Sequence, residues 1–395
     1  MNSNFKILLK RNKEAPLKRF HHWIFSGALQ PQNKLPSDGA IVEVYSYKKE
    51  FLGMGHYNDG NICVRMLSFK KEKIDTTFWA TRIQQALKLR SVLGITDSPS
   101  TNAYRLIHGE GDRLPGLVID NYNGHLVLQA HSTGMHLSRH DIAAALKTCL
   151  GAQLKSIYYK SGNTLPKSLQ LEDTEVFLHG DATDTIITEN GIPFYVNWEE
   201  GQKTGFFLDQ RENRQLLGSM AKGKRILNTF CYSGGFSMYG MRYGATLVHS
   251  VDASRKAIDW TLKNEALNTG NCEHKAVVDD VSKYIKASAM DYDIVILDPP
   301  AFAKNIRSKH RATIGYKNLN LQALKKMKAG SILFTFSCSQ PIDAGLFENT
   351  VRAAAIEAGK RIQVIKRLGQ PADHPINLFH PEVSYLKGLV LYVGD

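Results

Sequence analysis

The chain has 395 residues, of which 43% are hydrophobic and 22% charged, and this length and composition are typical of two or three domains with buried cores. No apolar stretch approaches the roughly 18 residues that cross a membrane, so we expect no contact with membranes. The formal net charge of +13 at pH 7 favours a polyphosphate partner such as nucleic acid, although a merely basic protein is the alternative.

The start of the chain and its cysteines narrow the class of protein further. Near the start of the chain, basic residues flank a short apolar patch, but the long apolar core of a signal peptide is missing. We therefore expect a cytoplasmic protein. The five cysteines form no CxxC pair, which argues against a disulfide framework or a structural zinc site. The fourteen histidines show no HxxxH-type pair with a third partner, so no metal is expected either.

The first seventy residues have the pattern of a small β module. Short apolar runs over 39–46, 50–58 and 61–69 are separated by turn signals, which predicts a barrel-like or sandwich-like arrangement of strands. Residues 18–25 precede these strands and combine basic with aromatic side chains. From residue 71 to 190 a helix is predicted over 75–94, followed by strands whose ranges are 114–123, 125–131 and 154–161.

After residue 222 strands and helices alternate regularly, which predicts an α/β sheet. The predicted strands cover 224–230, 246–252, 274–280, 293–300 and 330–339, with helices between them, for example over 254–268. The tail alternates two further runs, 361–368 and 384–393, and this suits a hairpin at one edge of the sheet.

Candidate binding residues follow the ends of these strands, where open α/β sheets bind ligands. Ser233, Gly234 and Gly235 allow a ligand to approach the backbone at the start of a helix, although tight packing also explains them. The loop is not GxGxxG, so it fits a nicotinamide fingerprint poorly. Asp252 ends the next strand and is predicted to bind ribose hydroxyls, with helix capping as the alternative.

Two further strand ends carry carboxylates. After the third strand, Asp279 and Asp280 are candidates for an adenine amino group; Asp280 is favoured, and capping is again the rival interpretation. After the fourth strand, Asp298 needs partners because it ends a buried run. Pro299 and Pro300 then predict a rigid floor beside a transferring methyl group or a target base, unless they only stiffen the loop.

Cys338 closes the fifth strand and is the candidate nucleophile. Cysteines on buried strands usually serve packing, but Ser337 and Ser339 flank this one at the ligand-binding edge, and Asp298 is expected to face the same cleft. A thiolate suits a reaction in which a carbon atom must be activated. Carbon 5 of a pyrimidine becomes nucleophilic when a thiolate adds to carbon 6. Asp298 would hold or protonate the ring through N3, and the target base must leave any stack to reach the pocket.

The motifs resemble those of a known family. NTFCYSGGFS, VDASRKAIDWTLKNEALN, DDVSKYI, DIVILDPPAFAKN and FTFSCS are similar to the motifs of class I methyltransferases. GQKTGFFLDQR, YRLIHGEGDRLPGLVID, ADHP and YLKG resemble, more closely, the large-subunit ribosomal RNA cytosine-C5 methyltransferases, which in bacteria include an enzyme that modifies 23S rRNA. The resemblance spans nearly the whole chain and implies S-adenosyl-L-methionine as cofactor.

The resemblance implies a PUA-like RNA-binding domain over 1–72, a central α+β domain over 73–190, and a Rossmann-like methyltransferase domain over 191–395 with a reversed last strand. It matches Cys338 to the motif VI nucleophile and Asp298 to the motif IV carboxylate. Together with the strand ends it implies cofactor contacts at Phe230, Tyr232, Ser233, Gly234, Asp252, Ala253, Asp279, Asp280, Val281, Asp298, Pro300, Asp209 and Arg211. Helix capping and a salt bridge are equally good interpretations of Asp209 and Arg211.

The partner implied is ribosomal RNA, either naked or in a partly assembled large subunit; a homodimer is compatible with the sequence. The expected RNA contacts are Lys18, Arg19, His22, Trp23 and Arg65. One departure from related enzymes is Ala301 with Phe302, where many RNA cytosine-C5 methyltransferases have a second cysteine that helps to release product. An RNA uracil-C5 methyltransferase and a purine N-methyltransferase therefore remain alternatives. A non-catalytic RNA-binding module is a third hypothesis, and the intact set of carboxylates together with Cys338 argues against it.

Overall fold

The computed structural model describes residues 5–166, 171–303 and 305–395, so Lys304 of the DPPAFAKN motif lies outside the described residues. The chain forms two compact units. The first unit comprises Met1–Thr185, Val196–Phe206 and Ala372–Val383, and the second comprises Ile186–Tyr195, Phe207–Pro371 and Ser384–Asp395. The domain boundaries at residues 72 and 190 remain a prediction.

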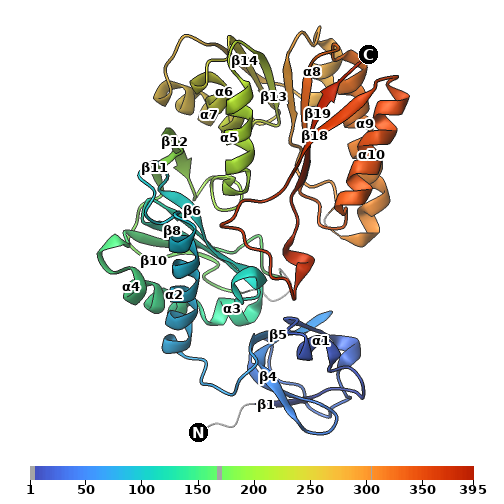
Figure 1. Ribbon diagram of the computed structural model, residues 1–395. Helices are drawn as coiled ribbons and strands as arrows, with labels where there is room; N and C mark the ends of the chain where they lie inside the picture. Colours follow the sequence, from blue (N-terminus) through green and yellow to red (C-terminus); the bar gives the residue numbers. More distant parts are fainter. Residues whose placement is uncertain (1–4, 167–170, 304) are drawn as a thin grey trace. The chain divides into compact units, whose positions relative to one another are not determined.

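The first unit begins with a five-stranded sheet, drawn in blue in Figure 1. The strand order is β1-β3-β4-β5-β2, with β1 parallel to β3 and the other pairs antiparallel. Apolar side chains such as Ile7, Val44 and Met66 fill its core, as expected for the predicted β module. The elements are β1 (Phe5–Leu8), α1 (Ala15–Lys18), β2 (Trp23–Phe25), β3 (Ile41–Tyr45), β4 (Phe51–Tyr57) and β5 (Ile62–Ser68).

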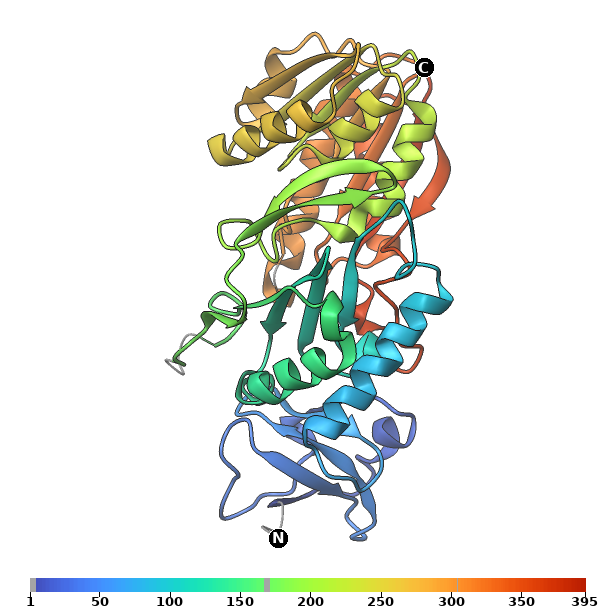
Figure 2. The same cartoon turned by 90° about the vertical axis from the view of Figure 1, so that its left-hand side faces the viewer.

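A second five-stranded sheet follows, in the order β10-β9-β8-β7-β6, and it is antiparallel except for the pair β8–β9. Its helices include α2, whose N-cap Asp75 accepts hydrogen bonds from the N–H groups of Thr77 and Phe78. Helices α2 and α4 pack against one face of the sheet (Figure 2). The elements are α2 (Thr76–Val92), β6 (Ala103–His108), β7 (Leu117–Tyr122), β8 (His125–Ala130), α3 (Thr133–Leu137), α4 (Arg139–Leu150), β9 (Ser156–Lys160) and β10 (Glu175–His179).

A hairpin of β11 (Asp184–Glu189) and β12 (Ile192–Asn197) comes next in the chain. Its turn residues Asn190 and Gly191 both have positive φ, at 50° and 78°. This is the turn geometry that an Asn-Gly pair favours between two strands. The Asn-Gly pair was the sequence signal for this hairpin, which was not predicted.

The second unit contains a seven-stranded sheet in the order β15-β14-β13-β16-β17-β19-β18. Among the described strands of this sheet, β19 alone runs against the others. The predicted α/β sheet, the reversed last strand and the edge hairpin are therefore confirmed. The strands are β13 (Arg225–Thr229), β14 (Leu247–Asp252), β15 (Glu273–Val278), β16 (Ile294–Leu297), β17 (Ile332–Ser337), β18 (Ile362–Leu368) and β19 (Lys387–Val393).

Helices cover both faces of this sheet, as in a Rossmann-like fold (Figure 1). The buried faces of α8, α9 and α10 pack on strand residues such as Leu227, Leu297 and Leu333. The helices are α5 (Arg211–Met220), α6 (Gly235–Arg242), α7 (Arg255–Leu267), α8 (Val281–Ala287), α9 (Lys309–Lys326) and α10 (Ala344–Glu357). Because β13 has β14 on one side and β16 on the other, the strand order reverses at β13, which is where sheets of this kind bind ligands.

Candidate active site

The loop after β13 is tightly wound. Phe230 and Tyr232 have φ values of 52° and 49°, which are uncommon for large side chains, and Gly234 has a φ of 77°. A Cβ atom on Gly234 would lie 2.8 Å from Cγ2 of Thr261, so glycine is required there for space as well as for conformation. Thr261 also donates a hydrogen bond of 2.8 Å to the Tyr232 carbonyl. Such strained backbone persists where its surroundings hold it, and it is frequent at ligand sites.

Asp252, at the end of β14, holds this loop. Its Oδ2 accepts the Tyr232 N–H at 3.0 Å and its Oδ1 accepts the Ser254 N–H at 2.9 Å. Helix α7 is capped by Ser254, whose Oγ accepts the Ala257 N–H, so capping does not explain Asp252. The carboxylate is partly exposed, and each oxygen keeps a second lone pair for a ligand hydroxyl.

The two carboxylates after β15 have local partners. Asp280 is the N-cap of α8 and accepts the Lys283 N–H at 2.9 Å, which is the rival interpretation of this residue. Asp279 accepts the Asp280 N–H at 2.8 Å. Asp280 is exposed, so the cap leaves its second oxygen accessible, whereas the neighbouring Val281 is buried. An adenine contact at Asp280 stays a prediction.

Asp298, directly after β16, is held by side chains from the start of α5. Nε2 of Gln210 donates to Oδ2 of Asp298 at 3.0 Å, and Nδ2 of Asn213 donates to Oε1 of Gln210 at 2.6 Å. Gln210 and Asn213 are both buried, whereas Asp298 is partly exposed. The chain of amides therefore orients the carboxylate while leaving part of it accessible. Gln210 lies in the LDQR motif between the two residues that the sequence singled out.

Those two residues, Asp209 and Arg211, are both buried, and each has 7% of its surface exposed. Oδ2 of Asp209 accepts a hydrogen bond of 2.7 Å from the Tyr385 hydroxyl. The N-cap position of α5 is occupied by Gln210, so Asp209 does not cap this helix. The bond from Tyr385 joins the LDQR and YLKG motifs.

Cys338 follows β17, which is the parallel neighbour of β16 with Leu297 opposite Thr335. Within the part of the chain that the structure describes, Cys338 belongs to no disulfide, and it is partly exposed. The next residue, Ser339, is fully buried; its Oγ accepts the Ala303 N–H at 3.1 Å and lies 2.8 Å from the Tyr316 hydroxyl. Ser339 therefore ties the Cys338 loop to the loop that begins at Asp298, as their positions on adjacent strands suggested.

Lys387, at the start of β19, is a site residue that the sequence reasoning noted only within the YLKG motif. It lies opposite Ser337 in the β17–β19 pair. Its Nζ donates to the carbonyls of Ser339 and Tyr385 at 2.6 and 2.8 Å. Burial lowers the pKa of Lys387 to about 8, and its charge interacts with Cys338. A lysine at the first position of an otherwise largely apolar strand was the available signal.

The expected RNA contacts lie in the first unit and differ in accessibility. Lys18 and Arg19 are exposed. His22 is buried, with Nδ1 2.8 Å from the Met66 carbonyl, and burial lowers its pKa to about 4. Nε1 of Trp23 donates to Glu110 at 2.7 Å, and Arg65 donates to Asn58 at 2.8 Å. Across the described residues, no helix is both long and apolar enough to span a bilayer.

The edge of the seven-stranded sheet fits S-adenosylmethionine by the chemistry of its groups. The Asp252 carboxylate can accept two ribose hydroxyls in addition to the two N–H groups it holds. The loop after β13 presents backbone at the N-terminus of α6, where N–H groups have no partner within the helix. Of the other expected contacts, Phe230 is partly buried, Ser233 is buried, and Ala253 and Pro300 are exposed.

Comparisons with known proteins agree with this arrangement. Residues 7–69 match the PUA-like domain family, and residues 164–388 match the S-adenosylmethionine-dependent methyltransferase family. Ribosomal RNA large subunit methyltransferase I of Tolumonas auensis is 38% identical over 398 residues, which cover 98% of each chain. The protein of that name from Photobacterium profundum is 39% identical over 396 residues, covering 98% of this chain and 99% of the relative.

A solved structure extends the likeness to three dimensions. A protein assigned as a methyltransferase and crystallised with SAH has a TM-score of 0.85 and 26% identity, over 98% of this chain and 99% of that chain. The expected N-terminal PUA domain, central α+β domain and Rossmann-like domain are thereby confirmed. The chain belongs to the ribosomal RNA large subunit methyltransferase I family and is a methyltransferase that depends on S-adenosylmethionine.

Proposed function

We propose that this protein methylates carbon 5 of a cytosine in large-subunit (23S) ribosomal RNA through a covalent adduct with Cys338. The names of its relatives support ribosomal RNA as the substrate. The observation that carries the cysteine mechanism is the loop of Cys338, joined to the Asp298 loop by the Ser339–Ala303 hydrogen bond. The proposal includes a cytoplasmic location and naked or partly assembled large-subunit RNA as the partner.

The chemistry needs a nucleophile because carbon 5 of cytosine does not take a methyl group unaided. The Cys338 thiolate forms a bond to carbon 6, and the electron pair of the 5–6 double bond makes carbon 5 nucleophilic. S-adenosylmethionine, when bound, supplies the electrophilic methyl group. After carbon 5 is methylated, a base removes its proton, the double bond re-forms, and the bond from carbon 6 to sulfur breaks to release Cys338.

Asp298 is the group we propose to bind the ring at N3, with one proton shared between its carboxyl group and N3 because both atoms are otherwise acceptors. Its carboxylate is oriented by Gln210, which is itself held by Asn213, so little reorganisation is needed when the base arrives. Lys387 acts as a positioning residue. A nearby cation favours a thiolate over a thiol, and the two bonds of Lys387 to carbonyl groups keep the ammonium in the Cys338 loop.

We propose the RNA contacts from the solvent exposure of the side chains. Lys18 and Arg19 are accessible basic side chains of the PUA domain and are suited to phosphate groups. Trp23 and Arg65 are partly exposed, while His22 supports the β5 backbone through Met66. RNA binding that is insensitive to salt would count against phosphate contacts at these residues.

The decisive test uses RNA in which the target cytosine carries fluorine at carbon 5. The base cannot remove fluorine as it removes a proton, so the protein–RNA adduct survives denaturation and is seen by mass spectrometry on Cys338. Cys338→Ala is expected to form no adduct and to lower methylation of ordinary RNA at least about 10³-fold. Cys272→Ala, at a partly buried cysteine outside this site, is the matched control and should form the adduct normally.

Each alternative activity has its own outcome in this experiment. An adduct with fluorinated uracil but not cytosine would show a uracil-C5 enzyme. Near wild-type methylation by Cys338→Ala would overturn the covalent mechanism and favour a purine N-methyltransferase. Mapping of the modified bases in RNA from cells that lack the gene identifies the nucleotide.

A further inference from the structure

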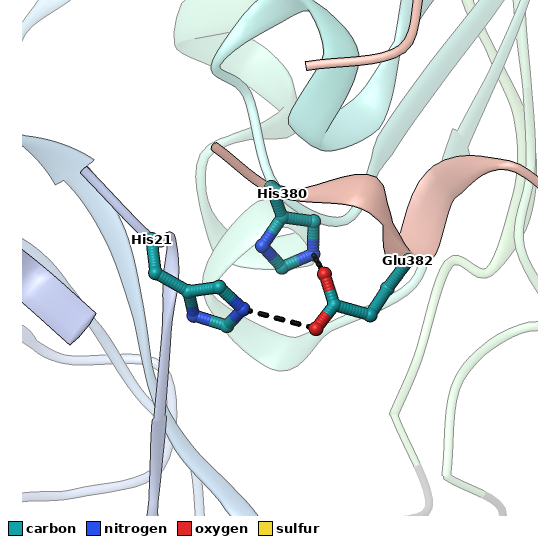
Figure 3. A group of neighbouring side chains, drawn as sticks. All are labelled: His21, His380 and Glu382. Carbon is teal, nitrogen blue, oxygen red and sulfur yellow. Dashed lines mark hydrogen bonds and ion pairs between the residues drawn. The ribbon is translucent and has the colours of Figure 1, made fainter. Parts of the chain in front are cut away.

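We propose that His21, His380 and Glu382 bind a divalent transition-metal ion, with Zn²⁺ as the preferred metal. All three residues belong to the first unit and lie outside the methyltransferase site. His21 precedes β2, whereas His380 and Glu382 come from the segment Ala372–Val383, between β18 and β19 in sequence. Figure 3 shows the three side chains converging.

The distances are close to those of a zinc site. Nε2 of His21 lies 3.2 Å from Oε1 of Glu382, and Nε2 of His380 lies 3.8 Å from Oε2 of the same carboxylate. The three donor atoms all lie within 4.8 Å of one another. Two ligands that bind zinc tetrahedrally at about 2.1 Å are about 3.4 Å apart. Small side-chain adjustments would therefore bring all three donors to bonding distance of one ion.

An independent observation points to a ligand at His380. Its side chain is fully buried, and neither ring nitrogen has a hydrogen-bond partner among the described residues. The rings of His21 and Trp23 pack against it, each at a centroid distance of 4.4 Å. Glu382 lies 3.8 Å from Nε2, which is too far for a hydrogen bond. A buried imidazole without hydrogen bonds is costly, and a metal bond at Nε2 lowers that cost. Figure 3 shows this nitrogen directed at the Glu382 carboxylate.

The second nitrogen of His21 is placed to support metal binding. Nδ1 of His21 lies 3.2 Å from the Trp23 carbonyl oxygen and also 3.2 Å from the Trp23 backbone nitrogen, whose N–H donates to it in the other tautomer. A ring that carries its proton on Nδ1 donates it to this carbonyl and leaves the Nε2 lone pair free for the ion. Zinc-binding histidines commonly have such a carbonyl partner, which fixes both the tautomer and the ring orientation.

The donor set selects the metal. Two imidazole nitrogens and one carboxylate oxygen suit Zn²⁺ and related transition metals, whereas Mg²⁺ and Ca²⁺ prefer oxygen ligands. Three protein ligands leave a fourth position for water or another group. The ion would join the start of β2 to the Ala372–Val383 segment across a sequence separation of 361 residues. The expectation that no metal binds came from local spacing, which does not detect ligands this far apart.

The experiment measures zinc binding by the purified full-length protein after removal of metals with a chelator. We expect one Zn²⁺ per chain in competition with a chromophoric chelator, and Co²⁺ in its place should give the visible absorption of a tetrahedral site. Glu382→Gln and His21→Gln each remove one ligand and should weaken the affinity at least about tenfold. His140→Gln, at an exposed histidine of the same unit, is the matched control and should bind as the wild type does.

Two results would overturn the proposal. One is a wild-type protein that retains no more zinc than Glu382→Gln does. The other is equal zinc affinity in the wild type and in both ligand variants, which would place the ion elsewhere on the protein. Circular dichroism of each variant shows whether it is folded, and methylation activity is not needed as a readout.

Discussion

The two halves of the active-site edge are built in different ways. At the ends of β13, β14 and β15, carboxylates accept backbone N–H groups, as Asp252 does from Tyr232 and Ser254. At the ends of β16, β17 and β19, side chains also bond to other side chains, as Gln210 does to Asp298, and to carbonyls, as Lys387 does to Ser339, besides the Ala303 N–H that Ser339 accepts. We call the first half the cofactor side and the second half the transfer side.

This difference indicates what each half must do. Backbone held by a carboxylate gives a fixed surface on which a ligand can be bound in one position. A network of buried side chains orients single groups such as Asp298 and Lys387 and adjusts their charge. Substitutions on the cofactor side should therefore change binding, and substitutions on the transfer side should change the rate of methyl transfer.

The largest expected effect on this comparison comes from Asp298→Asn, which removes the charge but keeps the shape of the side chain. Because Gln210 can still donate to the remaining oxygen, the loop should keep its structure. We expect kcat to fall by about 10²–10⁴-fold, the usual contribution of a positioned acid–base group. Affinity for S-adenosylmethionine, measured by calorimetry, should change little. Asp259→Asn, at an exposed carboxylate on α7, is the control and should leave both kcat and affinity unchanged. If Asp298→Asn lowered only the affinity for the cofactor, the distinction between the two sides would be wrong.

Asp252→Asn tests the other half and should have a smaller effect. The amide keeps one acceptor for a backbone N–H but cannot accept both the N–H groups and the ribose hydroxyls. Loss of one or two hydrogen bonds to a charged group weakens cofactor binding by about 10–100-fold. The kcat at saturating S-adenosylmethionine should stay near that of the wild type. A fall in kcat with unchanged affinity would contradict the assignment of Asp252 to the cofactor side.

The strands of the catalytic sheet were predictable because their apolar runs are long and end in polar or glycine-rich turns. The run over 293–300, for example, contains β16 (Ile294–Leu297), and Asp298 follows it as expected. The short β1 and β2 were not predicted, since three or four residues carry little periodicity. The candidate residues at strand ends were likewise accessible to sequence reasoning, because parallel strands bring their carboxyl ends to one edge.

Residues whose roles depend on distant partners were not predictable in the same way. Gln210 meets Asp298 across 88 positions, and Lys387 meets the Ser339 carbonyl across 48 positions. A sequence pattern shows neither pairing, because both follow from how the sheet and helices pack. Because both Ser and Asp cap helices well, the sequence left two interpretations of Asp252, with ribose binding favoured over capping. The N-cap of α7 is Ser254.

The smallest expected effect concerns Lys387, and it separates the charge of this side chain from its structural bonds. Burial lowers the pKa of Lys387 to about 8, so the ammonium is present below that pH and is lost as the pH rises through it. Lys387→Met removes the cation that favours the Cys338 thiolate. The alkaline rise of kcat/KM should therefore move to higher pH by about one unit, and the rate at pH 7 should fall about tenfold.

Lys387→Arg is the matched variant for this measurement, because it restores a cation and donors to the carbonyls of Ser339 and Tyr385. It should return the pH profile toward that of the wild type. A purely structural role would lower kcat/KM equally at every pH without shifting the profile. If both variants lowered the rate in that uniform way, Lys387 would only hold the Cys338 loop, and side-chain charge would no longer distinguish the transfer side from the cofactor side.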